Sequence, residues 1–193
     1  MARPSMAPQR REEILDALEF CILENGIQAS SLENIADKAG MKRTILRHYI
    51  GNRDDIICAL STRFCQNYAR QWQEILAWLP TVNRADALID TLFTIGSKEM
   101  IDVTIIGEAL FSEAKRLPQV KQDQEDVMAE FISHLTDALT IEYPTASPEK
   151  IDLVSHGIYA NYLLAESFLP LKLVNQVHKL KHSAKLLCSS LSI

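Results

Sequence analysis

The 193-residue sequence has no segment that could cross a membrane as a helix. Its longest stretch without Asp, Glu, Lys or Arg has 13 residues, Leu153–Ala165, whereas a spanning helix needs about 20 mostly apolar residues. Residues 1–11 include three arginines but no apolar stretch, unlike a secretory signal. These absences predict a soluble, cytoplasmic protein without membrane contact.

Cysteine is also scarce, with four residues and no C-x-x-C pair. If Cys58 and Cys65 share a helix, their Cα atoms lie roughly 10 Å apart. That separation exceeds the limit of about 7 Å for a disulfide, so we expect four reduced and mostly buried thiols. A hydrophobic fraction of 47% and a charged fraction of 23% are those of an ordinary globular protein rather than a disordered or disulfide-rich one.

Signatures of catalysis and of cofactor binding are missing too. The sequence has no G-x-S-x-G, H-E-x-x-H, phosphate-binding loop or dinucleotide-binding glycine motif. His178 and His182 lie four residues apart and could contact one metal ion, but two ligands do not make a site, and a solvent-facing pair explains them more simply. We predict no catalytic residue, no cofactor and no metal; a helical-bundle enzyme is the competing class.

Positive charge is concentrated in one short segment. The net charge is −5, yet residues 41–53 contain Lys42, Arg43, Arg47 and Arg53 and no Asp or Glu. A compact basic patch on an acidic protein would steer it onto a polyanion in a defined orientation. The alternative is that these side chains form an ordinary solvated face.

Apolar residues recur at a spacing of three to four almost throughout the chain, and no segment alternates as a strand does. The predicted fold class is therefore all-α, with about nine helices separated mainly by glycine and proline. The expected helices cover residues 10–25, 30–39, 42–49, 52–79, 84–97, 102–115, 119–142, 148–169 and 171–190.

Two of these helices begin with capping signals. Ser30 and Glu33 fit the S-x-x-E capping box, in which the serine accepts from a backbone N–H and the glutamate reaches back. Asn52 is placed to cap the long helix that follows it, and Asp54 and Asp55 in its first turn favour the helix dipole.

Three short helices within the first 50 residues are typical of a helix-turn-helix. Two steeply crossing helices need a small residue where they touch and a turn residue that tolerates positive φ, and Ala36 and Gly40 supply both. Leu46 and Ile50 form the apolar side of the next helix, whose other side is polar and basic. Two turns of helix, about 10 Å long, fit a major groove about 12 Å wide.

Residues 11–63 resemble the DNA-binding domain of the tetracycline repressor (TetR) family of transcriptional regulators. The spacing, the turn residue and the helix ends agree together, which makes the resemblance specific. The matching positions are Ala17, Gly26, Ser31, Ile35, Ala36, Lys38, Ala39, Gly40, Met41, Leu46, Tyr49, Ile50, Asn52, Arg53 and Ile56. The rest of the chain fits the family only in length and helix count.

The resemblance implies a DNA-binding domain at 1–53 and a helical ligand-binding and dimerisation domain at 54–193. The residues expected to face base edges are Lys42, Arg43, Thr44 and Arg47, with His48 on the same polar side. Arg43 and Arg47 are best suited to bidentate contact with guanine. Ser31, Tyr49 and Arg53 are expected to hold phosphates.

Two positions depart from the family pattern. Lys42 stands where the family commonly has a small polar residue, and Arg47 replaces a frequent aromatic one. A cation at a helix N-terminus opposes the dipole and gives up a cap, at a combined cost of about 1 kcal/mol. A nearby phosphate or guanine edge would compensate, so we expect Lys42 to be a functional contact.

The last two helices are expected to pair with those of a second subunit, as they do in this family. Leu173, Val177 and the apolar residues after them follow a heptad pattern. The preceding helix has two apolar stripes, so the subunit core can bury one and a second subunit the other. The predicted dimer contacts are Ile158, Tyr162, Ala165, Leu173, Val177, Leu180, Ala184 and Leu187. The lysine-rich segment 170–193 could alternatively be a membrane-surface helix.

The middle helices would form the pocket in which the family binds small-molecule effectors. The predicted lining residues are Phe64, Tyr68, Trp72, Phe93, Met100, Phe111, Phe131 and Tyr159. For each of them, an ordinary core position is an equally good interpretation. Charged residues near helix ends, such as Glu108 and Glu113, are expected to be solvated.

The resemblance therefore implies a homodimeric regulator, most often a repressor in this family, that binds a palindromic double-stranded operator and leaves it when a small-molecule effector binds. The alternative is a DNA-binding protein of the same fold that has no small-molecule effector and is controlled by protein partners.

Overall fold

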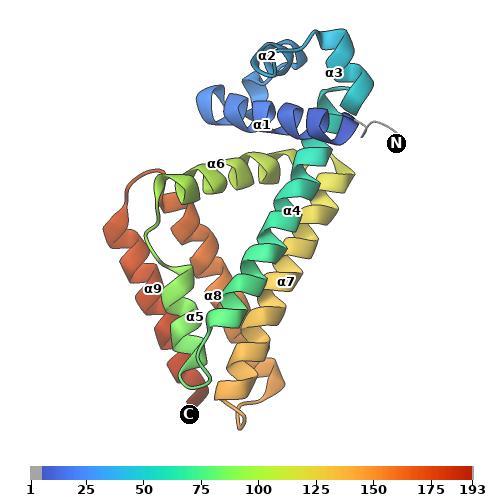
Figure 1. Ribbon diagram of the computed structural model, residues 1–193. Coiled ribbons are helices and arrows are strands. Elements are labelled where there is room, and N and C mark those ends of the chain that lie inside the picture. Colours follow the sequence, from blue (N-terminus) through green and yellow to red (C-terminus); the bar gives the residue numbers. More distant parts are fainter. Residues whose placement is uncertain (1–5, 193) are drawn as a thin grey trace. The chain divides into compact units, whose positions relative to one another are not determined.

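The computed structural model describes residues 6–192, and these residues form nine α-helices, two short 3-10 helices and no strand (Figure 1). The elements are α1 (Ala7–Asn25), η1 (Ile27–Ala29), α2 (Leu32–Lys38), α3 (Arg43–Ile50), α4 (Arg53–Trp78), α5 (Arg84–Leu92), α6 (Lys98–Glu113), α7 (Pro118–Glu142), α8 (Pro148–Phe168), α9 (Val174–Ser189) and η2 (Ser190–Ser192). The predicted all-α fold is confirmed, and most helix ends lie within a few residues of those expected.

The segment between α5 and α6 differs most from the expectation. Helix α5 ends at Leu92 rather than near residue 97, and α6 begins at Lys98 rather than near residue 102. The hydroxyls of Thr91 and Thr94 donate to backbone carbonyls one turn earlier, at 2.9 Å each. Such side-chain bonds compete with continued helix and accompany its end here.

The chain forms two compact units. The first contains the described residues up to Gln66 together with Ile105–Gln124, and the second contains Asn67–Thr104 and the described residues from Glu125 onward. The first unit thus extends beyond the boundary predicted at residue 53, because Ile56 and Leu60 of α4 are buried in its core. Residues 1–5 of the predicted DNA-binding domain lie outside the described residues.

The core of the first unit holds α2 and α3 against α1. Ile14 of α1, Ile35 of α2 and Leu46 of α3 have no exposed surface, and all three belong to one cluster. Ala36 is buried where α2 packs, and Gly40 in the following turn has φ +63°. The small residue and the left-handed turn residue therefore occupy the places that the sequence pattern predicts.

The caps confirm one prediction and correct another. Asn52 Oδ1 accepts from the backbone N–H of Asp54 (2.7 Å) and of Asp55 (3.2 Å), and Asp55 caps in return. The cap of α2, however, is Ser31, whose hydroxyl accepts from Asn34 N–H at 3.1 Å. Ser30 is buried and donates to the Gly26 carbonyl instead, so the predicted capping box was placed one residue too early.

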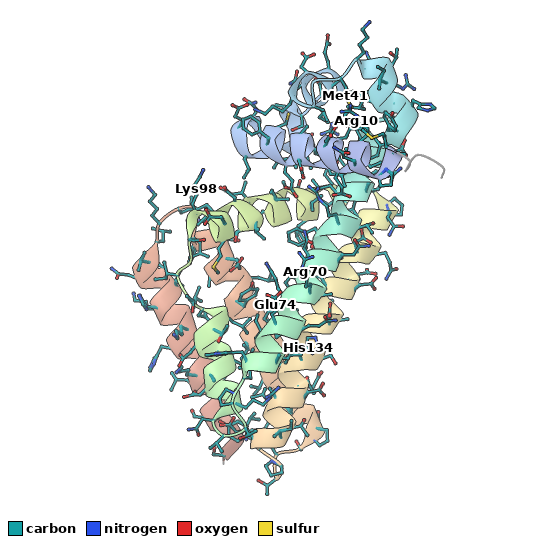
Figure 2. All side chains as sticks on the ribbon, in the orientation of Figure 1. Arg10, Met41, Arg70, Glu74, Lys98 and His134 are labelled. Atoms are coloured by element: carbon teal, nitrogen blue, oxygen red, sulfur yellow. The ribbon has the colours of Figure 1, made fainter. Side chains whose placement is uncertain are left out.

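The core of the second unit is centred on an aromatic pair from two helices. Trp72 of α4 meets Phe131 of α7 edge to face, with ring centroids 5.2 Å apart. His134, labelled in Figure 2, lies one turn along α7 with its ring 4.8 Å from that of Trp72. Leucine and isoleucine side chains of α5 and α8 complete this core.

We predict that Trp72→Ala lowers the free energy of unfolding by about 3–5 kcal/mol, because it leaves a large cavity in a close-packed core. Trp72 is 2% exposed and Trp78 is 69% exposed, so Trp78→Ala is the matched control, with an expected effect within about 0.5 kcal/mol. Urea unfolding followed by far-ultraviolet circular dichroism measures both. Equal effects of the two variants would contradict the packing described.

Candidate nucleic-acid interface

Helix α3 presents one apolar face to the core and one basic face to solvent. Leu46 and Ile50 are buried, whereas Arg43 and Arg47 are exposed, as are Lys42, Thr44 and His48. At eight residues, α3 is about 12 Å long. The predicted base-reading residues are thus all exposed, on α3 or at its start, and we call this set the basic face of α3.

The start of α3 is suited to negative charge. Lys42 is its N-cap residue, with extended backbone (ψ 139°), and its side chain makes no capping hydrogen bond. The first N–H groups of a helix have no partner within the helix and carry the positive end of its dipole. Lys42 and Arg43 add positive charge at the same end, and Arg47 and His48 lie in the last turn. An anion or a row of base acceptors would relieve this repulsion.

Ser31 and Tyr49, two of the predicted phosphate contacts, each contact neighbouring residues of the first unit. Ser31 is exposed and uses its oxygen as the cap of α2, which leaves the hydroxyl hydrogen available to an acceptor. Tyr49 is half-buried, with its ring against that of His48 at a centroid distance of 5.5 Å. Its carbonyl accepts from Arg11 Nη1 at 3.0 Å, which ties the end of α3 to α1.

Arg53 has an internal role that the sequence pattern did not reveal. Its Nε donates to the Ser30 carbonyl at 2.7 Å, and Nη2 donates to the Ile27 carbonyl. The remaining nitrogen, Nη1, is 3.9 Å from a carboxylate oxygen of Asp54. These contacts show that the Arg53 side chain holds the segment between α1 and α2, and its predicted phosphate contact stays a prediction.

A network of charges holds the same segment from α6. Glu113, expected to be solvated, is 1% exposed and accepts from Gln28 Nε2 at 2.7 Å. It also pairs with Arg116 at 2.5 Å, and Arg116 makes a bidentate contact with Asp54 at 2.7 and 2.9 Å. The Arg116 guanidinium lowers the pKa of Asp54 below its ordinary value. The partners are 62 and 85 residues apart in sequence, so no local pattern could have indicated them.

A depression lies beside the start of α3, with a volume of about 470 Å³. It is lined by Glu33, Ala36, Asp37, Gly40, Met41, Lys42 and Arg43. Met41, labelled in Figure 2, follows the turn between α2 and α3. Sequence reasoning missed Glu33 and Asp37 here, although their spacing places both on the α2 face that Ala36 occupies.

No family model matches the sequence, but two curated proteins match part of it. The HTH-type transcriptional regulator PksA of Bacillus subtilis is 39% identical over 49 residues, which are 25% of this chain and 24% of that protein. The HTH-type transcriptional repressor KstR2 of Rhodococcus jostii is 27% identical over 105 residues, 54% of this chain and 49% of that protein. The chain therefore spans about a quarter and about half of the length of these relatives.

Solved structures match over nearly the whole chain. A TetR transcription regulator from Haloarcula marismortui superposes with a TM-score of 0.79 at 15% identity, covering 95% of this chain and 98% of that one. This chain has the TetR-family fold. A transcriptional regulator from Rhodococcus sp. RHA1 gives a TM-score of 0.76 at 13% identity, covering 94% and 95% of the two chains. The predicted resemblance is thus confirmed as a likeness of fold.

In this TetR-family fold, five of the predicted pocket residues form one aromatic cluster in the second unit: Tyr68, Trp72, Phe93, Phe131 and Tyr159. Their rings pack in edge-to-face or tilted arrangements, joined by the ring of Tyr162. Burial raises the pKa of Tyr68, Tyr159 and Tyr162.

The remaining three predicted pocket residues lie outside this aromatic cluster. Phe64 packs in the core of the first unit against Gly107, where an added Cβ would lie 3.1 Å from its ring. Met100 and Phe111 are exposed, Phe111 to 61%. Spacing along α6 could not distinguish its buried face from its exposed one, because apolar residues occur on both.

A carboxylate at the aromatic cluster was missed by sequence reasoning. Glu166 of α8 is half-buried and accepts from Thr104 Oγ1 at 2.6 Å. Its negative charge adds to the effect of burial in raising the pKa of Tyr162.

Most of the predicted dimer contacts are buried within the subunit itself. Ile158 and Ala165 are buried in the core of the second unit, as are Val177 and Ala184 of α9. Tyr162 belongs to the aromatic cluster. Side chains that one subunit already buries cannot be covered by a second. The heptad positions of α9 face the core of their own subunit. Leu180 and Leu187 pack against that core, whereas Leu173 is exposed.

The other stripe of α8 faces solvent. Leu153 and Leu164 are 67% and 45% exposed, and Ala160 between them is also exposed. Leu186 of the neighbouring α9 is exposed as well. Helices α8 and α9 pack closely, since a Cβ on Gly157 would lie 3.0 Å from Leu187. We call Leu153, Ala160, Leu164 and Leu186 the outer apolar face.

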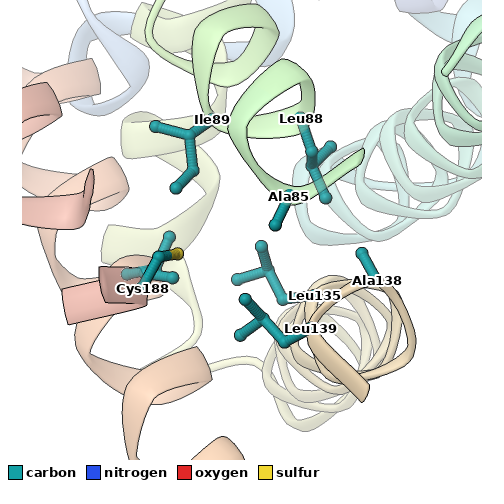
Figure 3. Close-up of a pocket in the computed structure, with 8 residues that line it drawn as sticks. Ala85, Leu88, Ile89, Leu135, Ala138, Leu139 and Cys188 are labelled. Carbon is teal, nitrogen blue, oxygen red and sulfur yellow. The ribbon is translucent and has the colours of Figure 1, made fainter. Parts of the chain in front are cut away.

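Other candidate sites have little to hold a ligand. The pocket in Figure 3, lined by Ala85, Leu135 and Cys188 among others, has no room for a water molecule. Burial raises the pKa of the Cys188 thiol to about 12, so this thiol is protonated at neutral pH. Within residues 6–192, no three His, Cys, Asp or Glu side chains are placed to hold a metal ion, and no helix is long and apolar enough to span a membrane.

We predict that Arg53→Ala lowers the free energy of unfolding by about 2 kcal/mol, because two backbone carbonyls lose a charged donor. Arg47→Ala, at an exposed position, is the control, with an expected change within about 0.5 kcal/mol. Chemical unfolding measures both. If Arg53→Ala left stability unchanged and weakened only DNA binding, a phosphate contact would be its role after all.

Proposed function

We propose that this protein is a homodimeric, sequence-specific DNA-binding transcriptional regulator, acting as a repressor that a small-molecule effector releases from its operator. The observation that carries the proposal is the basic face of α3, which is exposed on a helix whose apolar residues Leu46 and Ile50 are buried. The TetR-family fold and the two partial matches to HTH-type regulators support it.

The geometry favours duplex DNA as the polyanion. A recognition helix enters the major groove with its N-terminal residues against base edges, and Lys42 and Arg43 lie at the N-terminus of α3. Arg43 and Arg47 lie one turn apart, so their fork-shaped guanidiniums can address successive bases. A two-fold dimer would place two such helices in major grooves about 34–36 Å apart, which is why we expect a palindromic operator.

Salt dependence tests DNA binding directly. Lys42, Arg43 and Arg47 give six exposed cations per dimer. If each displaces one counterion, log K falls with log salt at a slope of about −5. Lys42→Gln should make the slope about 2 less negative, whereas Arg70→Gln, at an exposed position of α4 in the second unit, should leave it unchanged. Fluorescence anisotropy with a duplex from a footprinted site measures these slopes. A wild-type slope shallower than about −2 would contradict the proposal.

The outer apolar face supports the dimer. Four apolar side chains on adjacent helices are exposed, and a cluster of exposed apolar side chains is typical of an interface. We expect Leu164→Glu to weaken dimerisation at least a hundredfold, because two carboxylates would be buried at the two-fold interface. Leu171→Glu, at a position 64% exposed between α8 and α9, should have little effect. Sedimentation equilibrium measures both, and an undisturbed Leu164→Glu dimer would exclude this face.

The aromatic cluster with Glu166 at its edge supports the effector part of the proposal. Ligand sites are mostly apolar with a few polar groups that fix orientation. A ligand that favours the DNA-free state lowers DNA affinity by the factor by which DNA lowers ligand affinity. A thermal-shift screen with and without operator DNA should therefore find compounds whose stabilisation is smaller on the complex. A regulator controlled only by protein partners would yield none.

A further inference from the structure

The depression beside α3 brings two carboxylates and two cations to one surface. Glu33 and Asp37 line it from α2, and Lys42 and Arg43 line it from the start of α3. All four side chains are exposed. Ala36, which is 2% exposed, forms part of its wall, so a side chain without bulk keeps the space between the two pairs open.

The position of two carboxylates beside the proposed DNA-binding surface requires a physical reason, because the DNA backbone is itself negatively charged. Glu33 lies in the first turn of α2, where a negative charge favours the dipole, but Asp37 is the next-to-last residue, where a negative charge opposes it. Among the ion pairs of residues 6–192, none joins either carboxylate to Lys42 or Arg43. Phosphates repel both carboxylates, and a hydrogen-bond donor in the complex would offset this repulsion.

We propose that this depression reads one G·C base pair from both strands at once, with Arg43 on the guanine and a carboxylate of Glu33 or Asp37 on the cytosine. The inference rests on the proposed function and names the sequence feature that the protein selects. It makes the two acidic residues of α2 determinants of specificity, which attract one base and repel the backbone.

The chemistry of the base edges selects this pair. In the major groove, guanine offers the acceptors N7 and O6, and cytosine offers the N4 amino donor. An ionised carboxylate can only accept, so it matches cytosine. Adenine has a donor too, but its N7 acceptor lies beside the amino group and would repel the carboxylate. A cation beside a carboxylate therefore matches guanine paired with cytosine better than any other pair.

The matched variants exchange the carboxylate for an amide of the same shape. A side-chain amide pairs bidentately with N6 and N7 of adenine. One of the two variants, Glu33→Gln or Asp37→Asn, removes the carboxylate that contacts cytosine. That variant should therefore select adenine in place of cytosine at one position of each half-site. Discrimination for cytosine at that position should fall about tenfold, while affinity for random duplex rises because a negative charge is lost.

The experiment is selection from a randomised duplex library, followed by sequencing, with wild type, Glu33→Gln, Asp37→Asn and the control Glu24→Gln. Glu24 is an exposed acid of α1 that does not line the depression. Its loss should leave the selected sequence unchanged. Thermal unfolding of each variant confirms that these exposed substitutions leave the fold intact.

The possible outcomes separate this inference from the proposed function. If the wild type selects a sequence and at least one amide variant exchanges cytosine for adenine, the inference holds. If both variants select the wild-type sequence, the carboxylates only repel phosphates and the inference is wrong, although DNA recognition stands. If the wild type selects no sequence at all, the proposed function fails and the inference fails with it.

Discussion

The burial of Leu46 and Ile50 fixes the direction in which α3 presents its charges, and the proposed DNA-binding activity depends on that direction. Arg43 and Arg47, on the flank of this buried stripe, stay exposed to solvent, and Thr44 and His48 lie on the far side of the helix. This burial in turn requires α1 and α2 to keep their crossing, which the small side chain of Ala36 and the left-handed turn at Gly40 permit. The packing of Leu46 and Ile50 therefore limits the positions that the basic side chains of α3 can reach, and the proposed recognition of DNA depends on this packing.

Charge has two separate uses in the first unit. Arg53 and Arg116 are satisfied by carbonyls and carboxylates of the protein, and they connect the α1–α2 segment to α4 and α6. The basic face of α3 has no comparable protein partners among the ion pairs of the described residues. A partly buried arginine such as Arg53 would carry a desolvation cost if it lost its acceptors, so its contacts resist rearrangement. The external set, by contrast, can exchange water and counterions for DNA at little structural cost. This division explains how an acidic chain can have a polyanion as its partner.

Local patterns predicted the helices well because their causes are local. Apolar spacing, Asn52 as a cap and Gly40 as a turn residue each act over a few residues, and the structure contains each of them. The sequence could not show which of two apolar stripes on α8 faces inward, because both satisfy the same spacing; only the packing of α5, α7 and α9 decides it. The roles of Arg53 and Glu113 were missed for a related reason. Their partners are distant in sequence, and an arginine in a basic segment has the same pattern whether it faces carbonyls or phosphates.

The acidic residues beside α3 connect affinity to specificity. A surface with cations alone would bind any duplex, since phosphate attraction carries no sequence information. Carboxylates at the same surface weaken binding to any DNA site that offers them no hydrogen-bond donor. They therefore lower the affinity for the many non-operator sites more than the affinity for the operator. Discrimination arises from such repulsion as much as from attraction. For a regulator of the proposed kind, this ratio matters more than affinity alone. The acidity of α2 is then a property of the reading surface itself, and the small wall at Ala36 leaves the space in which a base edge can meet both kinds of charge.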